Sequence, residues 1–135
     1  MNLEGNRILI TGASGFIGSR VCERLYLRGK VHINAVVRNM GKAARIGRLG
    51  INICRCDILD KKNIKELIKE SDVVIHLAAG DKRTIIDGTE IVSTYSRKYG
   101  VKKFIHMSTA AVYGIQAKEE HIIEDAPIIK TGNPY

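Results

Sequence analysis

Three glycines at a spacing of three residues could bind a phosphate group. They lie in the stretch TGASGFIG, which directly follows a short run of β-branched residues. Gly12 would allow a tight turn out of a strand, Gly15 would let backbone amides approach a pyrophosphate, and Gly18 would let a helix pack closely on a sheet. The first turn of that helix would offer free N–H groups to the phosphates. The residues expected to contact a dinucleotide here are Gly12, Ser14, Gly15, Phe16, Ile17 and Gly18.

Hydrophobic periodicity predicts the elements that must position this loop. Short runs rich in β-branched residues predict five strands, at residues 7–11, 31–37, 51–56, 72–79 and 102–109. The segments between them have helical spacing. Ile17, Val21 and Leu25 recur every four residues until Gly29, which would cap the first helix. Asp60 would cap a helix whose Ile64, Leu67 and Ile68 share one face, and residues 84–99 would form the last helix.

The alternation of strands and helices predicts the fold class. Five strands with four intervening helices require a parallel sheet with helices on both faces, because each connection is long enough for a right-handed helical crossover. The run DVVIHLAA is apolar enough to be buried on both faces. We therefore expect an α/β fold: a Rossmann-like, doubly wound parallel sheet in three layers that ends after about the fifth strand. The polar segment from Ile115 to Tyr135 is expected to run over the surface.

Composition restricts the class of partner. The 135 residues, 44% of them hydrophobic, can bury one core. No run of about eighteen apolar residues and no signal-peptide pattern is present, so we expect a soluble, cytoplasmic protein without a membrane partner. The net charge of +8 suits a phosphate-bearing ligand or a nucleic acid. Because the basic residues are spread along the chain and only 5% are aromatic, nucleic-acid binding is the less favoured reading.

The three cysteines argue against a disulfide framework, because a chain that can bury a core does not need one. Cys54 and Cys56 are two residues apart, so both thiols would point to one face of a strand. No second pair of Cys or His follows at zinc-finger spacing. We expect core or half-buried thiols and no metal site.

The order of six motifs resembles a known family. The spacing G-x-x-G-x-x-G after Thr11 is followed by CDILD, HLAA, DGTEIV, FIHMSTAAVYG and EDAPIIKTGNPY, each at the end of an expected strand or in an expected helix or loop. This set resembles the NAD-dependent epimerase/dehydratase family, the extended branch of the short-chain dehydrogenase/reductase superfamily. The resemblance covers the whole chain. It implies that residues 1–135 form an NAD(P)-binding Rossmann domain.

The resemblance also implies cofactor contacts beyond the glycine loop. Asp57 matches the acidic residue that accepts a hydrogen bond from the adenine amino group, and Ile58 would pack beside the ring. The alternative for Asp57 is an aspartate that only stabilises a turn. The residues that match the strand end beneath the nicotinamide-side ribose are Leu77, Ala78, Ala79 and Gly80 of HLAAG.

The end of the second expected strand bears on the choice between NAD and NADP. A carboxylate there would hydrogen-bond the ribose hydroxyls of NAD, whereas an arginine would attract the 2′-phosphate of NADP. The sequence has Arg38 at this point, with Lys42 and Arg45 following at helical spacing. These residues favour NADP over NAD, and the alternative for them is a solvated basic face.

The catalytic residues implied by the resemblance are a hydroxyl, a tyrosine and a lysine four residues after the tyrosine. Thr109 matches the hydroxyl that would hold a substrate oxygen, although it could also simply end a strand. Tyr113 would lie near the substrate, and Tyr135 of TGNPY matches the acid/base. A phenol titrates near pH 10, so it needs a nearby ammonium to act as a base. The matching lysine position would be 139, beyond Tyr135.

These observations lead to one main functional expectation. The chain would be the cofactor-binding part of an epimerase, dehydratase or reductase that transfers a hydride between nicotinamide and a nucleotide-sugar. Without the lysine, the last strands and the substrate lobe, the chain would be inactive alone. Its exposed sheet edge would favour self-association into a homo-oligomer. The alternative is a dinucleotide-binding module without turnover. Two departures from the family, a short segment after HLAAG and Ile85 in place of a common Asn, affect the substrate side.

Overall fold

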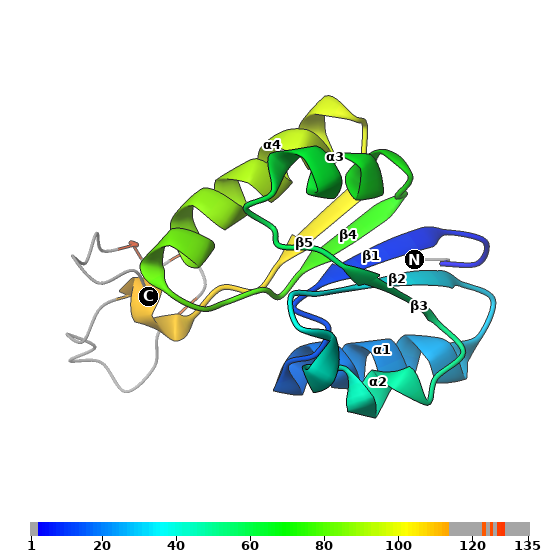
Figure 1. The fold of residues 1–135 in the computed structure, drawn as a ribbon. Helices are drawn as coiled ribbons and strands as arrows, with labels where there is room; N and C mark the ends of the chain where they lie inside the picture. Colours follow the sequence, from blue (N-terminus) through cyan, green and yellow to red (C-terminus); the bar gives the residue numbers. More distant parts are fainter. Residues whose placement is uncertain (1–2, 114–122, 124, 126, 129–135) are drawn as a thin grey trace.

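The computed structural model describes residues 3–113, 123, 125, 127 and 128. Five parallel strands form one sheet in the order β3-β2-β1-β4-β5 (Figure 1). The strands are β1 (Arg7–Thr11), β2 (His32–Val37), β3 (Asn52–Arg55), β4 (Val73–His76) and β5 (Lys103–His106). The α-helices are α1 (Phe16–Arg28), α2 (Ala44–Gly47), α3 (Lys61–Lys69) and α4 (Thr89–Lys98). The 3₁₀-helices are η1 (Met40–Lys42) and η3 (Ala110–Tyr113), and η2 (Thr84–Gly88) is a π-helical turn.

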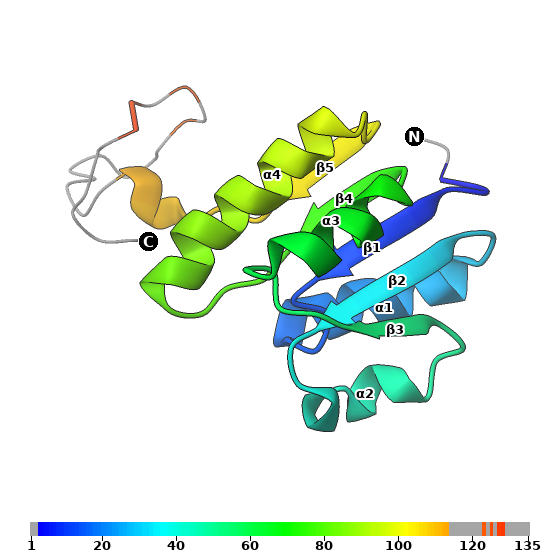
Figure 2. The same ribbon diagram turned by 45° about the horizontal axis from the view of Figure 1, so that its top comes forward.

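The helices cover both faces of the sheet, which confirms the expected three-layer, doubly wound fold. Helices α1 and α2 lie on one face, and α3 and α4 lie on the other (Figures 1 and 2). Each face has its own apolar cluster. Ile8 and Ile10 of β1 belong to the cluster under α1 and α2, whereas Leu9 belongs to the cluster under α3 and α4. The central strand is therefore apolar on both sides, as expected for a parallel sheet.

Four of the predicted strands begin one residue before the observed ones, and the predictions for β3, β4 and β5 extend too far at their end. β1 has the predicted bounds, but β4 stops at His76 and not at residue 79, and β5 stops at His106 and not at residue 109. Thr11 is the last residue of β1 to pair with β4, opposite His76. The chain turns away at Gly12, so the residues after His76 have no central strand to pair with.

Two of the predicted helix ends are built as the sequence suggests. Gly29 ends α1 with φ 67° and donates its N–H to Tyr26 O at 3.0 Å. Asp60 caps α3, because its side chain accepts hydrogen bonds from Lys62 N at 3.1 Å and Asn63 N at 3.2 Å. These ends are local in sequence, which is why they could be predicted.

The other helical segments differ in form from the prediction. Residues 84–98 are helical as predicted, but Thr84–Gly88 form the π-helical turn η2, and the α-helix α4 begins at Thr89. The basic residues after β2 do not share one helix either, since η1 and α2 are separated at Ala43. None of the helices in the described part of the chain is both long and apolar enough to cross a bilayer.

Candidate functional site

The glycine loop between β1 and α1 leaves no room for side chains at two of its positions. Gly12 has φ 68°, and a Cβ there would lie 2.6 Å from Leu77 O and 2.7 Å from Ala78 N of the neighbouring strand end. A Cβ at Gly18 would collide with the carbonyl oxygen of Gly12. The first glycine is therefore required by the close approach of β4, and the third by the packing of α1 on the loop.

The start of α1 is open toward the carboxyl ends of the strands. Gly15 is its N-cap residue, no side chain caps the helix, and its first turn holds no acidic residue. The apolar side chains of Phe16 and Ile17 are 79% and 46% exposed there. A helix start with these properties attracts an anion through its N–H groups and dipole, while the apolar side chains offer a wall for a ring or a ribose.

A groove of about 540 Å³ extends from the start of α1 across the carboxyl ends of β2, β3 and β4. Eleven of the thirteen residues predicted to contact the dinucleotide line it, and these are Gly12, Ser14, Gly15, Phe16, Ile17, Gly18, Arg38, Asp57, Ile58, Leu77 and Ala79. Ala78 and Gly80 do not line it, and the side chain of Ala78 lies against the α3 and α4 cluster. The topology thus brings together segments that are far apart in the sequence.

Two cations stand at the β2 side of the groove. Arg38 and Lys42 are exposed and line it, and neither forms an ion pair with another described residue. Asn39 lies between them and accepts a hydrogen bond from Gly41 N at 2.8 Å. Arg45 does not line the groove, because α2 begins after the break at Ala43. The predicted basic face is therefore reduced to two residues.

The turn after β3 provides the other end of the groove. Asp57 Oδ1 accepts a hydrogen bond from Leu59 N at 2.9 Å, so this aspartate does stabilise a turn, as its alternative reading proposed. It also lines the groove beside Ile58. Ile58 is 5% exposed and packs against Gly88 so closely that a Cβ at Gly88 would collide with its side chain. The start of α4 thereby fixes the position of Ile58.

Thr84 is a groove residue that the sequence did not reveal. It is 5% exposed, and its Oγ1 is the one buried side-chain oxygen without a hydrogen-bond partner in the described part of the chain. The pKa of the Asp81 carboxyl is lowered, first by the Thr84 N–H, which donates to Oδ1 at 2.8 Å, and then by the Thr84 hydroxyl nearby. The hydroxyl does not reach hydrogen-bond geometry with that carboxylate. A lone buried hydroxyl beside a groove is a candidate ligand contact.

The residues predicted for catalysis lie on the β5 side. Thr109 follows β5 and is half-buried, and Tyr113 is the last residue of η3. Neither lines the groove. Because β4 and β5 pair in parallel with His76 opposite His106, Thr109 follows β5 at the same distance in sequence as Ala79 follows β4. Tyr135 lies outside the described residues, so the pairing of Thr109 with Tyr135 stays a prediction.

The cysteines are free thiols. Cys56 is buried and lines the groove, and burial raises the pKa of its thiol to about 11. Cys54 is half-buried, and burial raises its pKa as well. Such thiols stay protonated near neutral pH, so they are poor nucleophiles and poor metal ligands. No group of three or more metal-binding side chains occurs among the residues that the structure describes.

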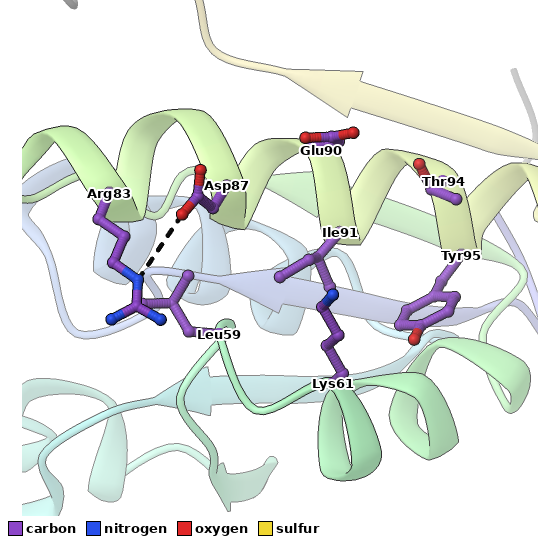
Figure 3. Close-up of a pocket in the computed structure, with 8 residues that line it drawn as sticks. All are labelled: Leu59, Lys61, Arg83, Asp87, Glu90, Ile91, Thr94 and Tyr95. Carbon is purple, nitrogen blue, oxygen red and sulfur yellow. Dashed lines mark ion pairs between the residues drawn. The ribbon is translucent and has the colours of Figure 1, made fainter.

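A second hollow, of about 340 Å³, lies between α3 and α4 (Figure 3). Ile91 and Tyr95 point from α4 toward Lys61 at the start of α3. At one end Arg83 Nε and Asp87 Oδ2 form an ion pair at 3.6 Å. None of the residues predicted for cofactor binding or catalysis lines this hollow. It lies away from the glycine loop, and its paired charges leave no net charge at that end to attract an anion.

Comparison with known proteins agrees with this geometry. The sequence model of the NAD dependent epimerase/dehydratase family matches residues 8–135. The chain is 40% identical to a UDP-N-acetyl-alpha-D-glucosaminuronate decarboxylase of Bacillus cytotoxicus over 123 residues, which is 80% of the chain and 38% of that protein. It is 30% identical to the UDP-glucose 4-epimerase of Bacillus subtilis, over 95% of the chain and 43% of that enzyme.

Solved structures show the same relationship. The UDP-glucuronic acid 4-epimerase from Bacillus cereus, crystallised with UDP-glucuronic acid and NAD, has a TM-score of 0.77 and 29% identity to the chain. That likeness covers 91% of the chain and 46% of the epimerase. The chain thus spans less than half the length of these relatives. The family match over nearly all of the sequence, on a sheet and a glycine loop of the expected form, confirms the resemblance: the chain belongs to the NAD dependent epimerase/dehydratase family.

Proposed function

We propose that residues 1–135 form the nicotinamide-dinucleotide-binding domain of a nucleotide-sugar epimerase, dehydratase or reductase. The observation that carries this proposal is the groove at the start of α1, where the glycine loop, two cations without an ion pair to a described residue and the turn after β3 converge. Relatives that act on UDP-sugars support the substrate class, and a solved relative that contains both NAD and a UDP-sugar supports the pairing of cofactor and substrate.

Each part of the groove has a role in this proposal. The N–H groups at the start of α1, with Gly15 as the N-cap, bind the pyrophosphate. Asp57 accepts a hydrogen bond from the adenine amino group through Oδ2, since its Oδ1 already accepts Leu59 N. Ile58 packs beside the adenine, and Ala79 lies beneath the nicotinamide-side ribose. Thr84 Oγ1 gains the hydrogen bond that it lacks without a ligand.

The chemistry follows from the bound cofactor. The nicotinamide ring supplies a carbon that accepts or returns a hydride. Thr109 holds the reacting oxygen of the sugar by a hydrogen bond, and Tyr135 exchanges the proton of that oxygen. The position of Thr109 beyond β5, on the same edge of the sheet as Ala79, supports its place beside the nicotinamide end.

The preferred cofactor in this proposal is NADP, with NAD as the alternative. Arg38 and Lys42 offer two positive charges at the end of β2, where a carboxylate would repel a 2′-phosphate. Calorimetric titration with NADPH and with NADH tests both the dinucleotide-binding function and the choice of cofactor. Binding of either dinucleotide is expected, with NADPH the tighter. Failure of both to bind at millimolar concentration would overturn the function itself, whereas tighter NADH binding would overturn the cofactor choice.

The charge of Arg38 can be tested separately. Arg38→Gln removes the contact to the 2′-phosphate, so the Kd of NADPH is expected to rise about tenfold while that of NADH changes little. Arg45→Gln is the matched control, because it removes the same charge outside the groove. An equal loss of NADPH affinity in both variants would show that the basic surface acts only through its overall charge.

A further inference from the structure

The side chain of His76 joins three elements beneath the groove. The ring is fully buried, at the end of β4. Its Nδ1 lies 2.7 Å from Thr11 Oγ1 of β1, and its Nε2 lies 3.1 Å from Thr89 Oγ1 at the start of α4. From β5, the rings of Phe104 and His106 stack on it at centroid distances of 6.2 and 5.4 Å. His76 pairs in the sheet in the same way as the apolar residues of β4. Its side chain differs from theirs, because both ring nitrogens have a polar partner.

The hydrogen-bond geometry assigns the proton of this ring. Thr11 Oγ1 accepts a hydrogen bond from Ala78 N at 3.3 Å and shares the Leu77 N–H, at 3.3 Å, with the backbone oxygen of Thr11, at 3.2 Å. Both of these partners are donors, so among the described residues around this oxygen His76 Nδ1 is left to accept the single hydroxyl proton. Since Nδ1 accepts, the ring proton must be on Nε2, from which it is donated to Thr89 Oγ1.

A protonated ring does not fit this network. A second N–H at Nδ1 would be a third donor toward Thr11 Oγ1 and would leave the hydroxyl proton without an acceptor among the described partners of this oxygen. Burial and the charge of His106 lower the pKa of His76 to about 4, in agreement with this count. The groups packed on the ring from β1, α4 and β5 are Thr11, Thr89, Phe104 and His106, and His106 is the one with an ionisable side chain.

The network holds the parts that shape the groove. Thr11 directly precedes Gly12, where the loop passes so close to Leu77 and Ala78 that no Cβ fits. Thr89 directly follows Gly88, which packs against Ile58. Through its two nitrogens, His76 therefore ties the glycine loop and the β4 end to the start of α4, and through α4 to the position of Ile58.

We propose that His76 is a positioning residue for the dinucleotide: its neutral ring, protonated on Nε2, fixes the glycine loop, the β4 end and the start of α4 at the spacing that the groove requires. This proposal rests on the proposed function for the identity of the ligand. His76 does not line the groove, so it acts through the backbone of its neighbours and not by contact with the cofactor.

The tautomer can be tested without any cofactor. Two-bond ¹H–¹⁵N spectra of the ¹⁵N-labelled chain report which ring nitrogen carries the proton. We expect the Nε2–H form for His76 at pH 7, with no change of its nitrogen shifts down to about pH 5. The Nδ1–H form, or uptake of a proton between pH 7 and about 6, would overturn the proposal.

The positioning role is tested by dinucleotide affinity in three variants. His76→Phe removes both hydrogen bonds and is expected to raise the Kd of NADPH about tenfold. His76→Asn keeps an acceptor close to the place of Nδ1, so the loss should be about threefold. His106→Phe is the matched control, since it keeps a stacked ring on His76 and removes no hydrogen bond of this network, and its Kd should stay within about twofold of the parent.

The possible results separate the two proposals. If the parent chain binds no dinucleotide, the proposed function fails. If the parent binds and His76→Phe binds equally well, the positioning role fails while the function stands. Equal losses in the Phe and Asn variants would also overturn the role assigned to the Thr11 hydrogen bond.

Discussion

The central strand β1 and the edge strand β5 belong to one sheet but differ in how completely their surroundings specify them. Four of the five residues of β1 are buried, and its exit at Gly12 has no room for a Cβ. None of the residues of β5 is buried. Ile105 of this strand is 41% exposed, and Met107, directly after the strand, is 48% exposed. The cofactor side is therefore fixed by close packing, whereas β5, at the edge of the sheet that the described residues form, presents apolar side chains that can still associate.

The largest effect is expected where β1 leaves the sheet. Gly12→Ala places a Cβ against the backbone of Leu77 and Ala78 at a positive φ, so the free energy of unfolding should fall by about 2 to 4 kcal/mol and NADPH binding should be lost. Gly29→Ala is the matched control, because Gly29 has φ 67° with nothing near its Cβ position. That variant should lose about 1 kcal/mol and keep its affinity. Equal losses in urea unfolding would contradict the packing argument.

A smaller effect is expected at His76 of β4, the strand between β1 and β5. The folded chain holds its pKa at about 4, below the ordinary 6.5, so the unfolded chain binds the proton first as the pH falls. Stability from this group is complete above about pH 6.5 and is lost as the pH falls to about 4, on the order of 3 kcal/mol in total.

Urea unfolding of the parent and of His76→Asn at several pH values measures this contribution. The variant should show a shallower fall of stability between about pH 6.5 and 4 than the parent. The acidic groups with lowered pKa values, such as Asp72, act in both proteins and do not affect the difference. Parallel curves for parent and variant would show that His76 takes up its proton equally in the folded and unfolded chain.

The smallest change in stability is expected at the β5 edge. Ile105→Lys should alter the free energy of unfolding by about 0.5 kcal/mol or less, because the side chain is partly exposed. Its effect should appear in association, since a charge on an edge strand opposes edge-to-edge pairing. Light scattering over a range of concentrations is expected to show self-association of the parent and less of it in the variant.

The control for this edge is another exposed apolar residue. Leu27→Lys changes a side chain on α1 that is 72% exposed and distant from the sheet edge, so association should persist. A parent chain that stays monomeric at high concentration would contradict the prediction. If Ile105→Lys and Leu27→Lys reduce self-association equally, the association depends on general surface hydrophobicity and not on the β5 edge.

How much of the fold and site could be predicted depends on how local each feature is. The bounds of β1, the Gly29 cap and the Asp60 cap were predictable, because a few neighbouring residues specify each. The end of β4 was not, because it depends on where β1 turns away at Gly12. Thr84 was missed for a similar reason. Its hydroxyl is buried by the packing of η2 against the strand end, and no spacing in the sequence reports that.

The sequence by itself determined the alternation of strands and helices, the glycine loop and the family, because these depend on residue types at short, fixed separations. The tertiary structure decided which distant residues share the groove and which ring nitrogen of His76 carries the proton. Thr11 and His76 are 65 residues apart, and His76 and Thr89 are 13 apart, yet their hydrogen bonds fix one tautomer. Such a network has no sequence period, because parallel strands bring its members together only through the crossovers between them.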